Sequence, residues 1–206
     1  MKNHIPVNSS DIFAKTFTLV LRFFADTFFA KRYGHRAVVL ETVAAVPGMV
    51  AGMWQHLTCL RRLQDDRGWI KVLLDEAENE RMHLMTFVQV AKPNLLERCL
   101  ILIAQAVFWN IYFVMYVFLP RTCHRLVGYF EEEAVISYTA YLNQVEANPE
   151  LNIAAPQIAI DYWHLPADAR LVDVIKAVRQ DEQGHSEVNH TFADSYDVKK
   201  SQNPLI

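Results

Sequence analysis

Two short motifs of the form Glu-x-x-His, at residues 80–83 and 182–185, constrain the fold of this 206-residue chain most strongly. Positions i and i+3 of a helix share one face, so each motif directs a carboxylate and an imidazole toward the same point. A further glutamate precedes each motif, Glu41 before the first and Glu131 before the second. Roughly 40 to 50 residues separate each glutamate from its motif, enough for one helix, a turn and part of the next at ~1.5 Å per residue. The chain therefore repeats a glutamate helix followed by a Glu-x-x-His helix.

Two such hairpins predict an all-α, ferritin-like four-helix bundle with a di-iron site in its interior. Hard carboxylate oxygens together with imidazole nitrogens favour iron or manganese, and the lack of thiolate clusters in the sequence argues against iron–sulfur chemistry. The alternative, ordinary solvated surface charges, is disfavoured because carboxylates on apolar helix faces are costly without a cation. The six predicted ligands are Glu41, Glu80, His83, Glu131, Glu182 and His185.

Helical phase separates these ligands from a third Glu-x-x-His copy at Glu187 and His190. Glu182 continues an apolar stripe along its helix, whereas Glu187 lies roughly 140° away from it. We therefore predict that the third copy lies on the outer face. The apolar partners of the ligands are Leu171, Val174, Ile175 and Val178 on the last helix, Leu73 and Phe87 around Glu80, and His124, Val127, Ala134 and Tyr138 around Glu131.

Composition fits one helical bundle. The chain is 52% hydrophobic and has only six glycines, so it can bury a sizeable core but offers little turn material for an all-β fold. A net charge of −3 gives no indication of nucleic-acid binding. The cysteines, Cys59, Cys99 and Cys123, share no metal-binding spacing, and we interpret them as small buried apolar residues of a reducing compartment.

The periodicity predicts an amphipathic N-terminal helix and then helices near residues 37–63, 66–91, 94–119, 122–147 and 167–194. Breaks fall at Gly68, at Pro93, at Pro120 and across a looser segment, 148–166, that contains three prolines. We divide the chain into an N-terminal arm with its amphipathic helix (1–35), a di-iron bundle domain (36–194) and a frayed C-terminal tail (195–206).

The stretch from Cys99 to Pro120 is almost entirely apolar and long enough to span a bilayer. A spanning helix, however, would start the Glu131 helix on the far side of the membrane, away from the other ligand helices. We therefore expect additional helices that lie on one leaflet, with arginines rimming the apolar patch. The alternatives for the 99–120 stretch are an ordinary buried helix or a dimer interface.

Four stretches of this sequence resemble the alternative oxidases, cyanide-insensitive quinol oxidases of mitochondria. The resemblance runs from about Tyr33 to His190 and is carried by RYGHRAVVLETVAAVPGM (32–49), LDEAENERMHLM (74–85), EEEA with SYT (131–134 and 137–139) and IDYW (160–163). It implies a ubiquinol:oxygen oxidoreductase with two iron ions per subunit that reduces O2 to water without pumping protons. It further implies a monotopic homodimer on the matrix side of the mitochondrial inner membrane. Because no presequence is recognisable at the start, we expect either a mature or trimmed form of such a protein, or a protein of a bacterial inner membrane or a reduced mitochondrial organelle.

The same resemblance assigns roles to individual residues. The six metal ligands predicted from spacing match the iron ligands of the family, and Tyr138 matches its redox-active tyrosine. Asn79, Tyr162 and Asp181 match positions that hold the ligands in place by hydrogen bonds. Arg36, Leu40, Ala134 and Ser137 match positions of the quinol pocket, and His124 and Glu133 lie close to that pocket. Two positions depart from the family: Gly184 replaces a histidine found in many members, and Ser137 replaces a threonine found in some.

Rival functions share parts of this pattern. A di-iron hydroxylase acting on a membrane quinone would use the same ligands, but it would insert oxygen into the ring. An iron-handling ferritin-like protein is disfavoured by the apolar outer surface, and a metal-free membrane protein is the third alternative. For some single residues a structural role is the alternative to a functional one. Tyr138 could be a buried, hydrogen-bonded tyrosine, Leu40 and Ala134 core residues, and Arg36 and His124 interface residues.

Overall fold

The protein is a bundle of long helices, seen in a computed structural model that describes residues 3–29 and 32–202, with side chains to residue 197. The helices are α1 (Ser9–Phe29), α2 (Tyr33–Arg62), α3 (Trp69–Ala91), α4 (Leu95–Phe118), α5 (Pro120–Ala147), α6 (Gln157–Trp163) and α7 (Leu171–Gln202), with a 3-10 turn, η1, at Pro149–Leu151. No β-strand occurs within the described ranges, where a single bridge joins Ala154 to Arg170. The prediction of an all-α fold is confirmed.

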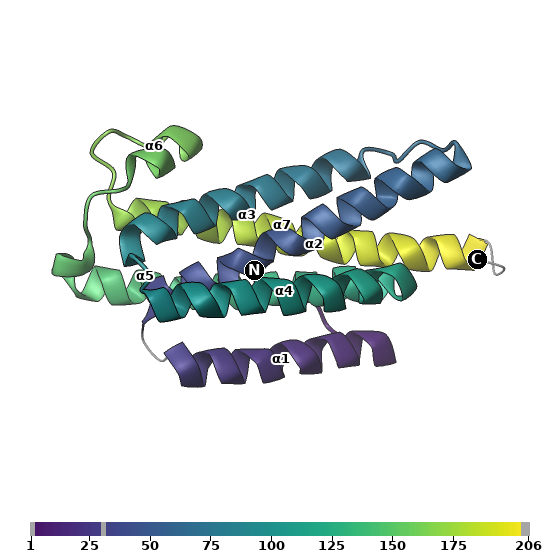
Figure 1. The fold of residues 1–206 in the computed structure, drawn as a ribbon, viewed down its shortest axis with the longest axis horizontal. Coiled ribbons are helices and arrows are strands. Elements are labelled where there is room, and N and C mark those ends of the chain that lie inside the picture. Colours follow the sequence, from purple (N-terminus) through teal and green to yellow (C-terminus); the bar gives the residue numbers. More distant parts are fainter. Residues whose placement is uncertain (1–2, 30–31, 203–206) are drawn as a thin grey trace.

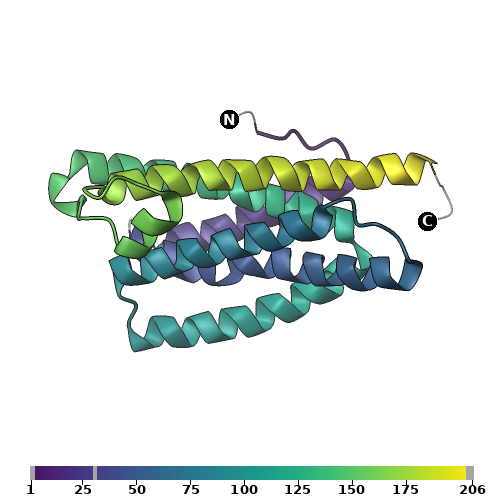
Figure 2. The same cartoon turned by 90° about the horizontal axis from the view of Figure 1, so that it is seen from above.

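Helices α2, α3, α5 and α7 form the four-helix bundle (Figure 1). α2 packs along α3, and α5 packs along α7, so the bundle consists of two helical hairpins. Helix α1 lies along one side of this bundle (Figure 1), and α4 lies along another (Figure 2). The core at one end includes Phe87, Leu142, Ile175 and Val178, all buried, which are the apolar residues that helical periodicity places on the inner faces.

Local sequence sets several helix ends. The Asn94 side chain caps α4 by accepting a hydrogen bond from the Glu97 backbone N–H, and the Glu97 carboxylate accepts one from the Asn94 backbone N–H. Pro120 occupies the first turn of α5, where its missing N–H costs nothing. The turn before α3 uses positive φ angles at Arg67 and Gly68. These short connections keep consecutive helices adjacent and so bring the two hairpins together.

Gly48 permits the close crossing of α2 and α3. A Cβ at this position would lie 2.4 Å from the backbone oxygen of Leu73, whereas a Cβ at Gly184 would meet nothing within 4 Å. We expect Gly48→Ala to destabilise the protein by about 1–3 kcal/mol, because backbone must shift to admit the methyl group. Gly184→Ala, the control, should stabilise it by about 0.5–1 kcal/mol through helix propensity. Chemical denaturation in detergent measures both, and equal stability of Gly48→Ala and wild type would contradict the tight crossing.

Several predicted boundaries differ from the structure by a few residues or more. α2 starts at Tyr33 rather than near 37, and the looser segment 148–166 contains α6. α7 continues to Gln202, so residues 195–202 are helical rather than a frayed tail, and 203–206 lie outside the described residues. Contacts from other helices hold this last part of α7: the Arg121 guanidinium donates to Asp197 over 2.7 Å, and Gln55 donates to Tyr196 over 2.9 Å. Such partners are distant in sequence and leave no local signal.

The third Glu-x-x-His copy was only half correctly predicted. Glu187 is exposed, as expected, but His190 is buried against α5. Its ring packs on Gly128, where any Cβ would lie 2.6 Å away; Nδ1 of the ring accepts from Arg125 over 2.9 Å and Nε2 donates to Glu132 over 3.2 Å. Because α5 offers both room and charged partners there, the histidine turns inward.

The cysteines do not share one environment. Cys123 is buried as expected, whereas Cys59 is partly exposed and Cys99 is exposed, so the prediction that all three are buried was wrong. Cys99 belongs to α4, whose outer face lies uncovered in the monomer. Apolar sequence therefore does not equal burial along this helix.

A candidate metal centre and an adjoining cavity

The six predicted ligands converge inside the bundle. Four of them, Glu41 from α2, Glu80 and His83 from α3, and Glu182 from α7, each offer one donor atom, and these atoms all lie within 4.8 Å of one another. His185 joins them, with its Nδ1 2.7 Å from Glu80 Oε1. The last predicted ligand, Glu131 of α5, is buried and lines a cavity together with Glu41 and Glu182.

The donor atoms of this cluster lie close to one another, but many of them form no hydrogen bond of acceptable geometry. These buried atoms include Oε2 of Glu41, both carboxylate oxygens of Glu80, Oε2 of Glu182 and Nδ1 of both histidines. Buried polar atoms in folded proteins are nearly always paired, so a group of orphans that face one another calls for an explanation. Divalent cations satisfy carboxylate and imidazole donors together, and the residues present therefore fit a pair of metal ions.

The shifted pKa values of the clustered carboxyl groups also support bound cations. Burial, together with the charges of Glu80 and Glu182, raises the pKa of Glu41 well above its ordinary value. Burial and the same two carboxylates also raise the pKa of Glu131. For Glu80, burial opposes ionisation, but the neighbouring imidazoles outweigh it and lower the pKa well below its usual range. Four carboxylates cannot all stay ionised here on their own, and cations would remove that conflict.

A second set of residues orients His83. Its Nε2 lies 3.3 Å from Asp181 Oδ2, which leaves Nδ1 facing the carboxylates. Asn79 donates to the same Asp181 oxygen over 2.9 Å and to the Tyr162 hydroxyl over 3.1 Å. The structure thus brings Asn79, Tyr162 and Asp181 together behind the ligand, an arrangement that fixes tautomer and ring orientation at metal sites.

Sequence reasoning missed one member of this set. Trp163, at the end of α6, donates its indole N–H to Asp181 over 2.8 Å and stacks on the His83 ring at 5.8 Å between centroids. The signal was the IDYW stretch, in which only Tyr162 received a role. The short helix α6 is what carries both residues to the end of the bundle.

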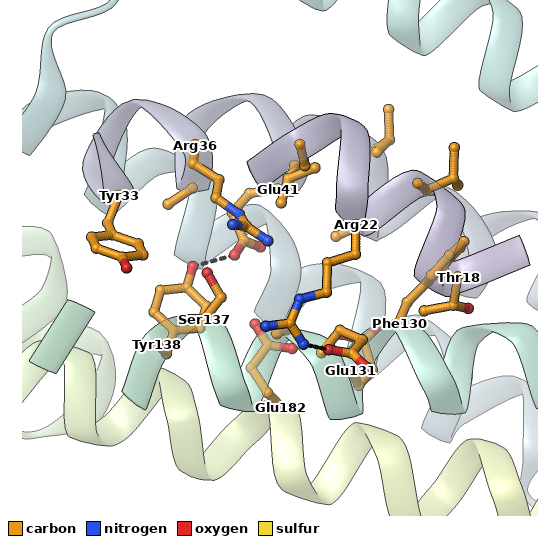
Figure 3. Close-up of a pocket in the computed structure, with 18 of the residues that line it drawn as sticks. Thr18, Arg22, Tyr33, Arg36, Glu41, Phe130, Glu131, Ser137, Tyr138 and Glu182 are labelled. Carbon is orange, nitrogen blue, oxygen red and sulfur yellow. Dashed lines mark hydrogen bonds and ion pairs between the residues drawn. The ribbon is translucent and has the colours of Figure 1, made fainter. Parts of the chain in front are cut away.

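A largely apolar cavity of about 210 Å³ leads to the cluster (Figure 3). At its inner end lie Glu41, Tyr138, Glu131 and Glu182. Five of the six residues predicted for the quinol pocket line it, namely Arg36, Leu40, Glu133, Ala134 and Ser137. Its other apolar walls come from Leu21, Ala25, Ala37, Val43, Ala44, Pro47, Phe108 and Phe130.

His124 does not line this cavity. It is buried instead between helices, where its ring nitrogens lie 2.9 Å from the Tyr116 hydroxyl and 3.0 Å from Asn189 Oδ1. Its place on the same α5 face as Glu131 suggested proximity to the pocket. However, it lies two turns nearer the N-terminus of the helix, beyond the cavity.

Helix α1 closes one wall of the cavity with residues that sequence reasoning did not single out. Arg22 forms an ion pair with Glu133, and Asp26 forms another with Arg36. Arg22 also bonds Asp26 over 3.2 Å, so the two pairs are linked. The sequence could not predict that Arg22 and Asp26 pair with residues of α2 and α5, because these ion pairs depend on where α1 packs against the bundle.

Tyr138 lies at the junction of cavity and cluster. Its hydroxyl donates a hydrogen bond to Oε1 of Glu41, as Figure 3 shows. Burial and the nearby Glu41 and Glu182 carboxylates raise the pKa of Tyr138 well above its ordinary value. The phenol therefore keeps its proton at neutral pH and holds it directly against a predicted metal ligand.

Four helices that bring four glutamates and two histidines to one buried point define the class of carboxylate-bridged di-metal bundle proteins. Residues 1–194 match the family model described as alternative oxidase. The chain belongs to the alternative oxidase family.

Individual relatives agree with this assignment. The mitochondrial ubiquinol oxidase of Batrachochytrium dendrobatidis is 56% identical over 192 residues, covering 93% of this chain and 61% of that protein. Mitochondrial ubiquinol oxidase 2 of Glycine max is 55% identical, covering 94% of this chain and 58% of that protein, and the Mangifera indica enzyme is 55% identical, covering 94% and 61%. The chain thus spans about three fifths of the length of these curated relatives.

Proposed function

We propose that this protein is a ubiquinol oxidase that couples oxidation of two quinols to reduction of one O2 to two waters. The observation that carries the proposal is the apolar cavity that ends at Tyr138, Glu41, Glu131 and Glu182. An apolar cavity with a few polar groups at its closed end suits a substrate with an aromatic head and a hydrocarbon tail. The names of the relatives described above support the same substrate.

We propose that two iron ions occupy the cluster, held by Glu41, Glu80, His83, Glu131, Glu182 and His185. When bound, they would supply electron transfer and Lewis-acid activation of oxygen. The orphaned carboxylate and imidazole atoms support this assignment. Reduction of O2 to two waters takes four electrons and four protons, and two quinols deliver both in full.

In this proposal, residues of the cavity position the quinol and move its protons. Arg36 is buried and its Nε has no partner, so it offers a donor to a quinol oxygen. Glu133 accepts from Arg22 and provides a carboxylate that can take up a quinol proton. Tyr138 holds its proton against Glu41 at the inner end, where it can donate a hydrogen atom toward the cluster.

We propose that the protein lies on one leaflet of a membrane. Two helices, α2 and α4, are long and apolar enough to span a membrane. Only 11% of the apolar 18-residue stretch of α4 is buried within the protein, against 56% of the corresponding stretch of α2. The outward apolar residues are Phe13, Phe17, Val20, Phe23, Phe24 and Phe28 on α1 and Leu102, Ile103, Val107, Ile111, Val114 and Phe118 on α4. Such faces suit burial in the acyl region of one leaflet.

This topology predicts that positions before and after α4 are accessible from the same side. We expect Lys71→Cys on α3 and Glu150→Cys after α5, both exposed positions, to react with a membrane-impermeant maleimide from one side of sealed proteoliposomes. The background is Cys59→Ser/Cys99→Ser, because these two native cysteines are partly exposed and exposed, whereas Cys123 is buried. A spanning α4 would place the two probes on opposite sides. Protection of one probe until the vesicles are lysed would therefore reject the proposal.

We also propose the cellular setting that the family resemblance implies: a homodimer on the matrix side of the mitochondrial inner membrane. The printed names of the relatives, which include the word mitochondrial, support the organelle. The exposed apolar side chains on the surface of α4 support a second copy of the chain as a neighbour there.

The deciding experiment is oxygen uptake by iron-loaded protein supplied with a short-chain ubiquinol in the presence of cyanide. We expect uptake at half the rate of quinol consumption, with unmodified quinone as the product. A hydroxylated ring would instead identify a quinone hydroxylase. Absence of turnover by protein that carries two irons per chain would contradict the proposed activity.

A further inference from the structure

A second buried polar layer lies one to two helical turns from the metal-ligand layer. It consists of Glu76 of α3, Asn189 of α7, His124 of α5 and Tyr116 of α4, all buried. Glu76 precedes the ligand Glu80 by one turn, and Asn189 follows the ligand His185 by one turn. The layer therefore sits beneath the ligands on two of the helices that carry them, and on α7 it lies on the side away from Asp181.

Hydrogen bonds link all members of this layer. The Asn189 amide nitrogen donates to both Glu76 oxygens, over 2.9 and 3.0 Å, and lies 3.0 Å from the carbonyl oxygen of His185. Asn189 Oδ1 lies 3.0 Å from Nδ1 of His124, whose Nε2 lies 2.9 Å from the Tyr116 hydroxyl. Each of the four side chains in this layer thus has a hydrogen-bond partner, although none of the four is a predicted ligand.

The chemistry of the groups fixes the direction of each bond. The His185 backbone carbonyl only accepts, so the Asn189 amide must turn its NH2 group toward that carbonyl and toward Glu76, and its oxygen toward His124. His124 must then carry its proton on Nδ1, which leaves Nε2 to accept from the Tyr116 hydroxyl. Burial lowers the pKa of His124 to about 4, so the ring stays neutral and keeps this single tautomer. The layer is therefore an ordered chain with one arrangement of donors.

Asn189 and Glu76 join the two helices that carry the Glu-x-x-His motifs. α7 packs along most of α5 but meets α3 at few positions. On α7, Asp181 accepts from Asn79 of α3 on one side of the ligands Glu182 and His185, and Asn189 donates to Glu76 of α3 on their other side. The two α7 ligands thus lie between two hydrogen bonds to α3.

We infer that Asn189 is a positioning residue that, through Glu76 and His124, sets the register of α7 against α3 and so places His185 and Glu182 opposite Glu80. Neither of these hydrogen bonds touches the cavity, so this role is independent of substrate binding. It explains why a chain of buried polar groups is present at a depth where apolar residues would pack without hydrogen bonds. It also gives His124 a role other than the pocket role that its sequence position suggested.

The test uses cobalt(II) as the only added metal, because its visible absorption reports coordination geometry without turnover. We expect Asn189→Leu to bind Co²⁺ at least tenfold more weakly than wild type and to show an altered cobalt spectrum at saturation. Ser186→Ala is the matched control: it removes a buried bond of 3.0 Å from the neighbouring turn of α7 to the Gly128 carbonyl on α5. It should retain the wild-type spectrum, because α5 and α7 are held together along their whole length.

Two further variants separate positioning from simple loss of stability. Glu76→Gln keeps an oxygen that accepts from Asn189, so its spectrum at saturation should match wild type even if loss of the charge weakens affinity. The double variant Glu76→Leu/Asn189→Leu removes both partners, so it should regain stability relative to Asn189→Leu while the altered spectrum persists. A wild-type spectrum and affinity in Asn189→Leu, or their return in the double variant, would overturn the inference.

The inference rests on the metal centre of the proposed function, and the outcomes keep the two apart. Wild-type protein that binds no Co²⁺ would reject the centre itself. Normal Co²⁺ binding by both wild type and Asn189→Leu would reject only the role of Asn189.

Discussion

Replacement of Tyr138 by phenylalanine is expected to abolish quinol oxidation while leaving the fold and the metal content intact. The change removes one hydroxyl and almost no volume, so the lost bond to Glu41 should cost about 1 kcal/mol of stability. The hydroxyl lies where the cavity meets the cluster and donates to Glu41, so its loss removes a hydrogen-atom donor to oxygen chemistry. A barrier increase of ~4 kcal/mol already slows turnover about a thousandfold, and we expect at least that decrease.

Cyanide-resistant, quinol-dependent oxygen uptake measures this effect, with iron content matched between variant and wild type. Tyr112→Phe is the control, because Tyr112 is equally buried but its hydroxyl has no hydrogen-bond partner and lies outside the cavity. It should retain wild-type turnover. Near wild-type rates in Tyr138→Phe would make Tyr138 a structural residue.

Replacement of Glu182 by glutamine is expected to remove bound metal without unfolding the protein. Glu182 raises the pKa of both Glu41 and Glu131, so its charge opposes the other carboxylates in the metal-free protein. Deleting that charge relieves the repulsion, and the apoprotein should be at least as stable as metal-free wild type. Elemental analysis should show two irons per chain in wild type and fewer than one in the variant.

Thermal unfolding with and without a chelator provides the second measurement. Wild type should lose about 2.7 kcal/mol or more on chelation if metal was present at a hundred times its Kd, whereas Glu182→Gln should respond little. Ile175→Ala, a fully buried truncation on the same helix, should cost about 2–5 kcal/mol in either state. A well-folded wild type with less than one metal per chain after iron-replete expression would contradict the centre.

Helix positions and inner faces followed from local sequence. The phase of Glu182 with Ile175 and Val178 fixed which side of α7 faces the interior, because one turn of helix relates residues three and four apart whatever lies outside it. The same rule identified four of the six candidate ligands, since a Glu-x-x-His motif is a geometric unit by itself, and the other two, Glu41 and Glu131, followed from their spacing before the motifs. Proline and capping signals at Asn94 and Pro120 located helix ends for equally local reasons.

The contacts between side chains of different helices could not be predicted from the local sequence. His124 and His190 both turned out to be buried among polar residues from other helices, and neither Arg22 nor Asp26 could be assigned to the cavity. Phase fixes the face on which a side chain lies, but the height and rotation of neighbouring helices fix which groups meet there.

By itself, the sequence determined the helices, their inner faces and the candidate ligands of the proposed centre, because these depend on spacing along one chain. Only the tertiary structure decided that α1 closes the cavity, that α7 remains helical to Gln202, and that Asn189 joins α7 to α3 beneath the ligands. Each of these depends on groups more than a hundred residues apart or on different helices, whose meeting is set by packing of the whole bundle.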